Sequence, residues 1–220
     1  MFALQTRYLS FFFGLISILS FFNIIYSYYL NLYLNLDTYY GSFLISLFVS
    51  IIFYKIKTTQ KKLSIFDKIL TVFLGYLLLP LVLSIPFYFS IYDLTFLNSY
   101  FESISGFTST GFTIFENIKL IDQSLILWRS STQWIGGLYF LFSIIFLIDI
   151  YDENFKKTLT NYISFDSSEI FKQASKIFLL YSFLTLFIFI VLNVFSVRSF
   201  NSLNLAFSLI SSGGFLPVND

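Results

Sequence analysis

The 220-residue sequence contains neither cysteine nor histidine, and it is poor in charged residues. These absences exclude disulfides, thiolate nucleophiles, histidine bases and the commonest zinc sites. Charged residues make up 11% of the chain, against 57% hydrophobic and 23% aromatic residues, whereas a soluble domain carries about a quarter charged residues. The net charge of +1 gives no basic surface for nucleic acid. The composition therefore predicts an all-α integral membrane protein that is not an enzyme and holds no cofactor of its own.

Long uncharged runs predict five membrane-spanning helices, each about long enough to cross the hydrocarbon core at about 1.5 Å per residue. They lie at residues 8–36, 38–54, 69–92, 130–148 and 177–197. The first run follows Arg7 but is too long for a signal peptide, so we interpret it as a retained membrane anchor.

The placement of lysine and arginine predicts the orientation of the chain. One side of the membrane would carry ten of the 13 basic residues: Arg7, Lys55, Lys57, Lys61, Lys62, Lys68, Lys156, Lys157, Lys172 and Lys176. The other side would carry Lys119, Arg129 and Arg198. This bias predicts a multi-pass membrane protein with its N-terminus in the cytoplasm. The segment between Asp93 and Arg129 would then begin and end outside.

That segment has the pattern of a re-entrant loop. Asp93 is a suitable cap for a helix that runs to about residue 105 and is too short to cross the membrane. Residues 107–113 follow, rich in Thr, Ser and Gly. An ordinary extracellular turn explains this composition equally well. Glu102, late in the short helix, either supports the loop by hydrogen bonds or reaches water at the membrane surface.

A polar loop at membrane depth would have a chemical use for its backbone. Non-helical backbone is tolerated there only inside protein or beside water, and a row of carbonyl oxygens can replace the hydration shell of a potassium ion. Gly111 would supply the positive φ that such a strand needs, and the C-terminus of the preceding helix favours a cation. A second short helix at residues 201–210, capped by Asn201 or Ser202, precedes Ser211-Ser212-Gly213. Gly111 and Gly213 are 102 residues apart, which indicates a partial repeat.

Four segments in order resemble the bacterial Trk/Ktr potassium transporter family. They are Ser84-Ile85-Pro86-Phe87, the first loop at residues 100–113, the Trp128-Arg129…Gln133-Trp134-Ile135-Gly136-Gly137 block, and the second loop at residues 207–215. The two helices before residue 64 resemble the extra N-terminal pair of the longer members. The resemblance implies four consecutive M1–pore loop–M2 units around a potassium path.

The resemblance also implies site residues and partners. Backbone carbonyls expected to bind potassium, the transported substrate, are those of Thr108, Ser109, Thr110, Gly111, Ser211, Ser212 and Gly213, with Glu102 as support for the filter. The family's filter glycine would be Gly111 in the first loop and Gly213 in the second. The protein would be a homodimer in the lipid of the bacterial inner membrane, with a cytoplasmic nucleotide-binding regulatory subunit of the TrkA/KtrA kind. It would take up potassium down its electrochemical gradient.

The family pattern divides the chain into four parts. We expect two N-terminal helices and a basic loop (1–63), a first M1–pore loop–M2 unit (64–150), a cytoplasmic amphipathic linker (151–176) and an incomplete second unit (177–220). Because four units close a pore, we expect these 220 residues to be a fragment, or a truncated product, of a chain about twice as long. Two alternatives stay open: a membrane structural or assembly protein without transport activity, and a secondary transporter for another substrate.

Overall fold

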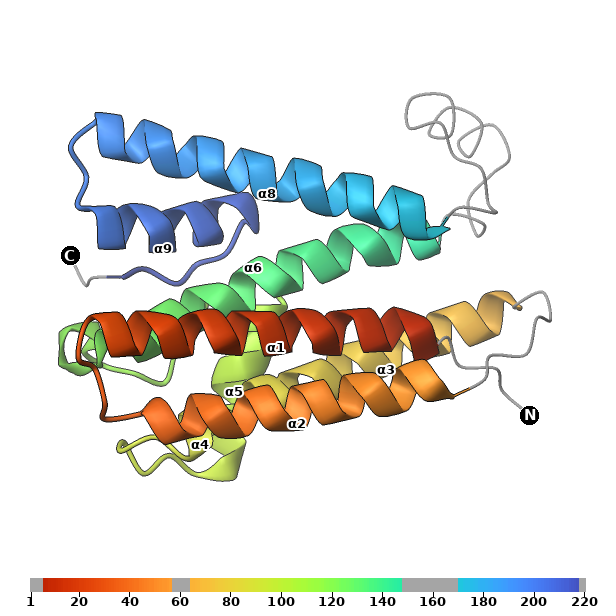
Figure 1. Cartoon of the computed structure of the whole chain (residues 1–220), viewed down its shortest axis with the longest axis horizontal. Helices are drawn as coiled ribbons and strands as arrows, with labels where there is room; N and C mark the ends of the chain where they lie inside the picture. Colours follow the sequence, from red (N-terminus) through yellow and green to blue (C-terminus); the bar gives the residue numbers. More distant parts are fainter. Residues whose placement is uncertain (1–5, 57–63, 148–169, 218–220) are drawn as a thin grey trace.

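The computed structural model describes residues 6–56, 64–147 and 170–217, and these residues form helices joined by turns and short loops, with no strand among them (Figure 1). The elements are α1 (Thr6–Tyr29), α2 (Leu36–Lys55), α3 (Ile65–Leu83), α4 (Ile85–Tyr88), α5 (Phe96–Phe107), the short 3-10 helix η1 (Ile118–Leu120), α6 (Gln123–Phe146), α8 (Ile170–Val194) and α9 (Ser199–Ile210). The all-α prediction is confirmed for these residues. Most of the predicted linker, up to residue 169, and residues 57–63 of the basic loop lie outside them.

Four helical segments are long and apolar enough to cross a membrane: α1, α2, α3 continued by α4, and the part of α8 from Ser175 to Val194. They correspond to the first, second, third and fifth predicted spans. The fourth predicted span corresponds to α6, which is as long as α1 but is not among these four. α6 is more polar than these four segments. Most of its side chains are buried against other helices, and side chains that do not face lipid need not be apolar.

The helix boundaries differ from the predicted ones where turn chemistry overrides hydrophobicity. The predicted first span runs to residue 36, but α1 ends at Tyr29 because Asn31 adopts a φ of 56°. The backbone N–H of Leu32 then donates to the carbonyl of Ser27 at 2.8 Å, a bond that closes a helix C-terminus. Asp93 was also the wrong cap for α5. Thr95 is the cap, and its hydroxyl accepts from the backbone N–H of Asn98 at 3.3 Å.

The third span is interrupted near its C-terminal end. α3 contains Pro80 and stops at Leu83, and Pro86 lies in the first turn of α4. The indole N–H of Trp128 donates to the carbonyl of Leu83 at 3.0 Å, at the break between the two helices. Hydrogen bonds from neighbouring helices are the usual compensation for proline in a membrane helix.

α6 is the central helix of the molecule, with α8 and α9 on one side of it and α1, α2, α3 and α5 on the other (Figure 1). The Asn23 amide of α1 donates to the Ser124 backbone carbonyl in α6. Side chains of α6 also hydrogen-bond to Tyr39 of α2 and to Thr185 of α8. Aromatic rings fill the spaces between α1, α3 and α6, where Phe12 and Tyr139 meet edge to face at 4.7 Å. Polar groups of α6 therefore find hydrogen-bond partners on several neighbouring helices inside the protein.

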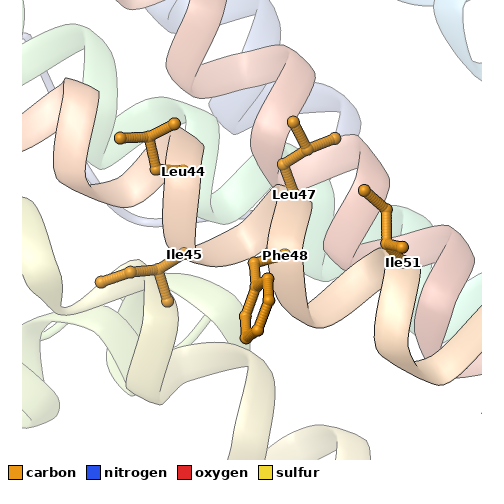
Figure 2. A pocket seen from close by; sticks show the side chains of 5 residues that line it. All are labelled: Leu44, Ile45, Leu47, Phe48 and Ile51. Carbon is orange, nitrogen blue, oxygen red and sulfur yellow. The ribbon is translucent and has the colours of Figure 1, made fainter.

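The middle of α2 carries an exposed apolar surface. A shallow groove there is lined by Leu44, Ile45, Leu47, Phe48 and Ile51 (Figure 2). It offers no polar atom that could bind an ion, and its composition is typical of a lipid-facing surface.

Candidate functional site

The first loop begins where α5 closes in a left-handed turn. Ser109 has a φ of 55°. The backbone N–H groups of Ser109 and Thr110 donate to the carbonyls of Gly106 and Ser105, each at 2.9 Å. This is a Schellman closure, in which a residue with positive φ ends the helix. The helix therefore stops at a fixed residue, and the chain leaves it as non-helical backbone.

The second loop begins in the same way after α9. Ser212 has a φ of 54°. The backbone N–H groups of Ser212 and Gly213 donate to the carbonyls of Leu209 and Ser208 at 3.1 and 2.7 Å. α5 and α9 both have 12 residues. The two helix–loop units are therefore built alike, as the partial repeat in the sequence indicated.

A serine hydroxyl sets the return of each loop. Ser105 donates to the carbonyl of Phe112 at 2.6 Å, and Ser208 donates to the carbonyl of Phe215 at 2.8 Å. In both cases the donor lies seven residues before the acceptor. These bonds fix which residues of the two loops are equivalent.

The alignment of the first loop with the second differs by one residue from the alignment predicted from the sequence. The helix starts, the positive-φ serines and the serine–phenylalanine bonds are all 103 residues apart, so Gly111 corresponds to Gly214. The pairing of Gly111 with Gly213, 102 residues apart, was wrong, and Gly213 corresponds instead to Thr110. It was wrong because two adjacent glycines follow the serines in the second loop and composition alone does not choose between them.

The two loops meet at these equivalent glycines. Gly111 has a φ of 81°, and a Cβ atom on it would lie 2.5 Å from the Cα of Gly214. A Cβ on Gly214 would lie 3.7 Å from the carbonyl oxygens of both Thr110 and Gly111. Carbonyls of the first loop therefore lie close to the second loop, and no side chain fits between the two backbones at this point.

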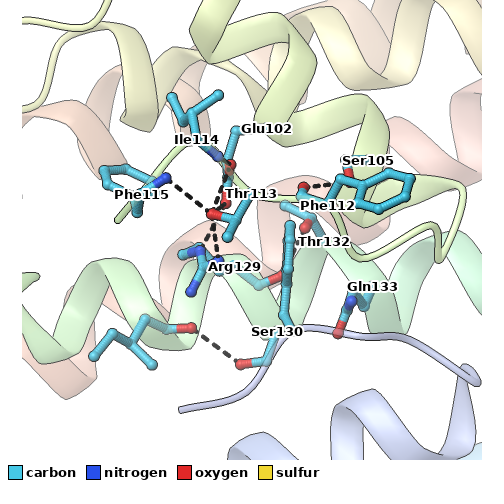
Figure 3. Close-up of polar contacts among 12 residues, drawn as sticks. Glu102, Ser105, Phe112, Thr113, Ile114, Phe115, Arg129, Ser130, Thr132 and Gln133 are labelled. Carbon is cyan, nitrogen blue, oxygen red and sulfur yellow. Dashed lines mark hydrogen bonds and ion pairs between the residues drawn. The ribbon is translucent and has the colours of Figure 1, made fainter. Parts of the chain in front are cut away.

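Glu102 holds the C-terminal part of the first loop. Its carboxylate is fully buried and accepts the Thr113 hydroxyl at 3.0 and 3.1 Å and the backbone N–H of Ile114 at 3.0 Å (Figure 3). It also accepts from Nε of Arg129 at 2.8 Å. The structure thus brings Glu102 to the loop rather than to solvent.

Arg129, one of the three basic residues that the charge pattern placed opposite the other ten, is buried. Its side chain is 1% exposed, and Nη2 donates to the Thr113 hydroxyl at 2.9 Å. The guanidinium carbon lies 4.2 Å from the ring centroid of Phe215, in the second loop, and 5.5 Å from that of Phe115. Nη1 has no hydrogen-bond partner among the described residues, so the aromatic faces supply part of its environment.

Gln133, one helical turn further along α6, holds the second loop. The Ser208 hydroxyl donates its hydrogen bond to the carbonyl of Phe215. Its oxygen therefore accepts from the Gln133 amide N–H, at 2.7 Å. In that orientation the Gln133 carbonyl oxygen accepts the backbone N–H groups of Gly214 and Phe215 at 2.9 and 2.8 Å. A single helix therefore supports both loops, through Arg129 and Gln133.

Adjacent glycines let α6 approach the ends of both short helices. A Cβ on Gly136 would lie 1.9 Å from the carbonyl oxygen of Phe107, at the end of α5. A Cβ on Gly137 would lie 2.7 Å from the Cβ of Ser211, at the end of α9. The two glycines thus let α6 lie close to both loop-bearing units.

The other predicted ion-binding residues lie in these two turns. Thr108, Thr110 and Ser212 are exposed, Ser109, Gly111 and Gly213 are half-buried, and Ser211 is buried. The structure brings the two groups together at the Gly111–Gly214 contact, with Glu102 behind the first. Sequence reasoning did not assign a role to Thr113, Arg129, Gln133, Gly214 or Phe215 in the site. The repeated Gly-Phe pair at 111–112 and 214–215 was the available signal for the last two.

These features define a class: a helical membrane protein in which two short-helix–loop units of one design share a supporting helix. The chain matches no protein-family model. It is 31% identical over 126 residues to an uncharacterized cation transporter of Methanocaldococcus jannaschii, covering 56% of this chain and 26% of that protein. It is 25% identical over 173 residues to the Trk system potassium uptake protein TrkH of Salmonella typhimurium, covering 76% of this chain and 36% of that protein.

The fold has a solved counterpart. The potassium transporter TrkH from Vibrio parahaemolyticus superposes with a TM-score of 0.75 over 96% of this chain and 43% of that chain, at 18% sequence identity. The predicted resemblance is therefore confirmed: the chain is TrkH-like in sequence and in fold. It spans about a quarter to a third of the length of these curated relatives.

Proposed function

We propose that the two loops are two walls of a potassium-selective path, and that the protein serves potassium uptake as the membrane subunit of a Trk-type system. α6 would cross the membrane with the four apolar segments, and α5 and α9 would be re-entrant. The observation that carries the proposal is the meeting of two loops of one design at Gly111 and Gly214, with the carbonyls of Thr110 and Gly111 beside the contact. The names of the relatives support potassium as the ion.

The chemistry of the loops fits a dehydrated cation. Thr108 to Gly111 would present backbone carbonyls in the first wall, and Ser211, Ser212, Gly213 and now Gly214 would do so in the second. The C-termini of α5 and α9 direct the negative ends of their helix dipoles toward the loops. The described loop residues 107–115 and 211–217 carry no ionised side chain that would replace these neutral ligands.

Potassium-dependent growth tests the proposal. The full-length gene product is expressed in a strain that lacks its own potassium uptake systems, and growth is measured at low potassium. The wild type is expected to restore growth and Gly111→Ser to abolish it, because the new side chain would collide with the Gly214 backbone and strain a positive φ. Gly41→Ser on α2 is the matched control, since a Cβ there meets nothing within 4 Å. Unchanged growth with Gly111→Ser would refute the filter assignment.

The same experiment separates the alternatives. A structural or assembly protein would not restore growth at low potassium. A transporter of another substrate would restore it only if potassium entered together with that substrate. We further propose a homodimer in the inner membrane, an N-terminus in the cytoplasm and a cytoplasmic nucleotide-binding regulatory partner. Cross-linking in membranes, labelling of an N-terminal tag from each side and co-purification would test these three proposals in turn.

A further inference from the structure

We infer that Arg129 is a positioning residue that couples the two loops, so that the width of the path between them depends on its guanidinium group. This inference rests on the proposed function and adds a role for a side chain that the charge pattern assigned only to one side of the membrane. An ionisable residue inside a membrane protein is costly, and its retention indicates a function.

The contacts to the first loop go through two groups. Nε of Arg129 donates to Glu102 at 2.8 Å, and Nη2 donates to the Thr113 hydroxyl at 2.9 Å. Thr113 in turn donates to Glu102 and accepts the backbone N–H of Phe115 at 3.1 Å. All four residues thus form one connected network, and its geometry fixes the backbone immediately after Gly111 (Figure 3).

The contact to the second loop is made by the flat face of the same group. The guanidinium carbon lies 4.2 Å from the centroid of the Phe215 ring, and the Phe215 side chain is 3% exposed. The carbonyl and N–H of Phe215 are held by Ser208 and Gln133. A shift of Phe215 would therefore also move Gly214, its neighbour in the chain, which packs against Gly111.

Only arginine makes both contacts at once. Its planar group donates through several N–H bonds along its edge while its face stacks on an aromatic ring. A lysine ammonium would keep the charge opposite Glu102, but it is a point charge with no flat face. Charge balance and loop coupling can therefore be separated by experiment.

The test measures ion selectivity in the full-length protein. Rubidium uptake is followed in proteoliposomes, and the concentrations of potassium and sodium that halve it are compared. We expect Arg129→Lys and Thr113→Val to lower the ratio of the half-inhibitory sodium concentration to the half-inhibitory potassium concentration by about tenfold, the size of a typical coupling between two sites. The double variant Glu102→Gln/Arg129→Gln removes both buried charges and also the guanidinium that links the two loops. Its selectivity should fall by the same factor. Arg198→Lys, at an exposed arginine, is the matched control.

The outcomes distinguish this inference from the proposed function. If Arg129→Lys or the double variant keeps the wild-type ratio while Gly111→Ser loses it, the path exists but Arg129 does not position it. If the wild type shows no preference for potassium, the proposed function itself fails. If neither Arg129→Lys nor Thr113→Val reaches the membrane, the network is a folding element and the positioning role is overturned.

Discussion

Nε of Arg129 lies 2.8 Å from Oε1 of Glu102, and the two side chains are 1% and 0% exposed. They come from α6 and α5, 27 residues apart. An ion pair buried so completely contributes little net stability as a pair, because both charges lost their water, but it is costly to break on one side only. This asymmetry gives the first prediction.

Glu102→Gln is expected to destabilise the protein more than Glu102→Gln/Arg129→Gln. The single change leaves the Arg129 charge buried without a counter-charge, a loss of about 3–5 kcal/mol, whereas the double change removes both charges. Thermal unfolding of the detergent-solubilised protein measures the order. A double variant less stable than the single one would contradict it.

Gly136→Ala is expected to disrupt the junction between α6 and α5. The new Cβ would lie 1.9 Å from the Phe107 carbonyl oxygen, and backbone on both sides would have to move. Overpacking of this kind costs about 1–3 kcal/mol or more. Gly41→Ala, with open space around the new methyl, should be neutral or stabilising by helix propensity alone. Equal unfolding temperatures for the two variants would contradict the close approach.

Gln133→Leu is expected to loosen the second loop and leave the first intact. The backbone N–H groups of Gly214 and Phe215 lose their acceptor, at a cost of about 1–3 kcal/mol for each unsatisfied group. Hydrogen exchange should quicken in residues 211–217 and stay unchanged in residues 107–115. Gln123→Leu, at the start of the same helix, serves as the control. Unaltered protection of the second loop would show that Gln133 does not hold it.

The equivalence of the two loops predicts paired effects for Ser105→Ala and Ser208→Ala. Each change removes the hydroxyl that holds the returning carbonyl of Phe112 or Phe215. Both changes should raise the rubidium concentration that gives half-maximal uptake, and by a similar factor. Under the 102-residue pairing, Ser105 would correspond to Phe207 rather than Ser208, and a silent Ser208→Ala variant would favour that pairing.

The sequence was sufficient to predict the helical membrane fold and the place of both loops. Long uncharged runs predict spans because lipid excludes charge, and a dozen residues before a Ser/Thr-Gly segment are too few to cross. Helix ends were less predictable, because a single positive φ at Asn31 closed α1 within an apolar run. The more polar α6 also showed that hydropathy fails where a helix faces protein instead of lipid.

The hydrogen-bond network that supports the first loop could not be predicted from the sequence. Glu102, Thr113 and Arg129 are 11 and 16 residues apart along the chain, and no local spacing brings them together. Their contact depends on how α6 packs against α5, which in turn depends on Gly136. Arg129 and Gln133 lie four residues apart on one helix, so a common face was foreseeable, but the two loops that this face supports were not.

The central claim is that potassium binds to loop carbonyls beside the Gly111–Gly214 contact, and anomalous X-ray diffraction tests it most directly. Crystals of the full-length protein grown in rubidium salt would be measured at the rubidium absorption edge. The account predicts an anomalous peak within coordination distance of the carbonyl oxygens of Thr110 and Gly111 and of the second loop. Rubidium transport by the same protein with no peak at these carbonyls, or with a peak held by side chains elsewhere, would contradict it.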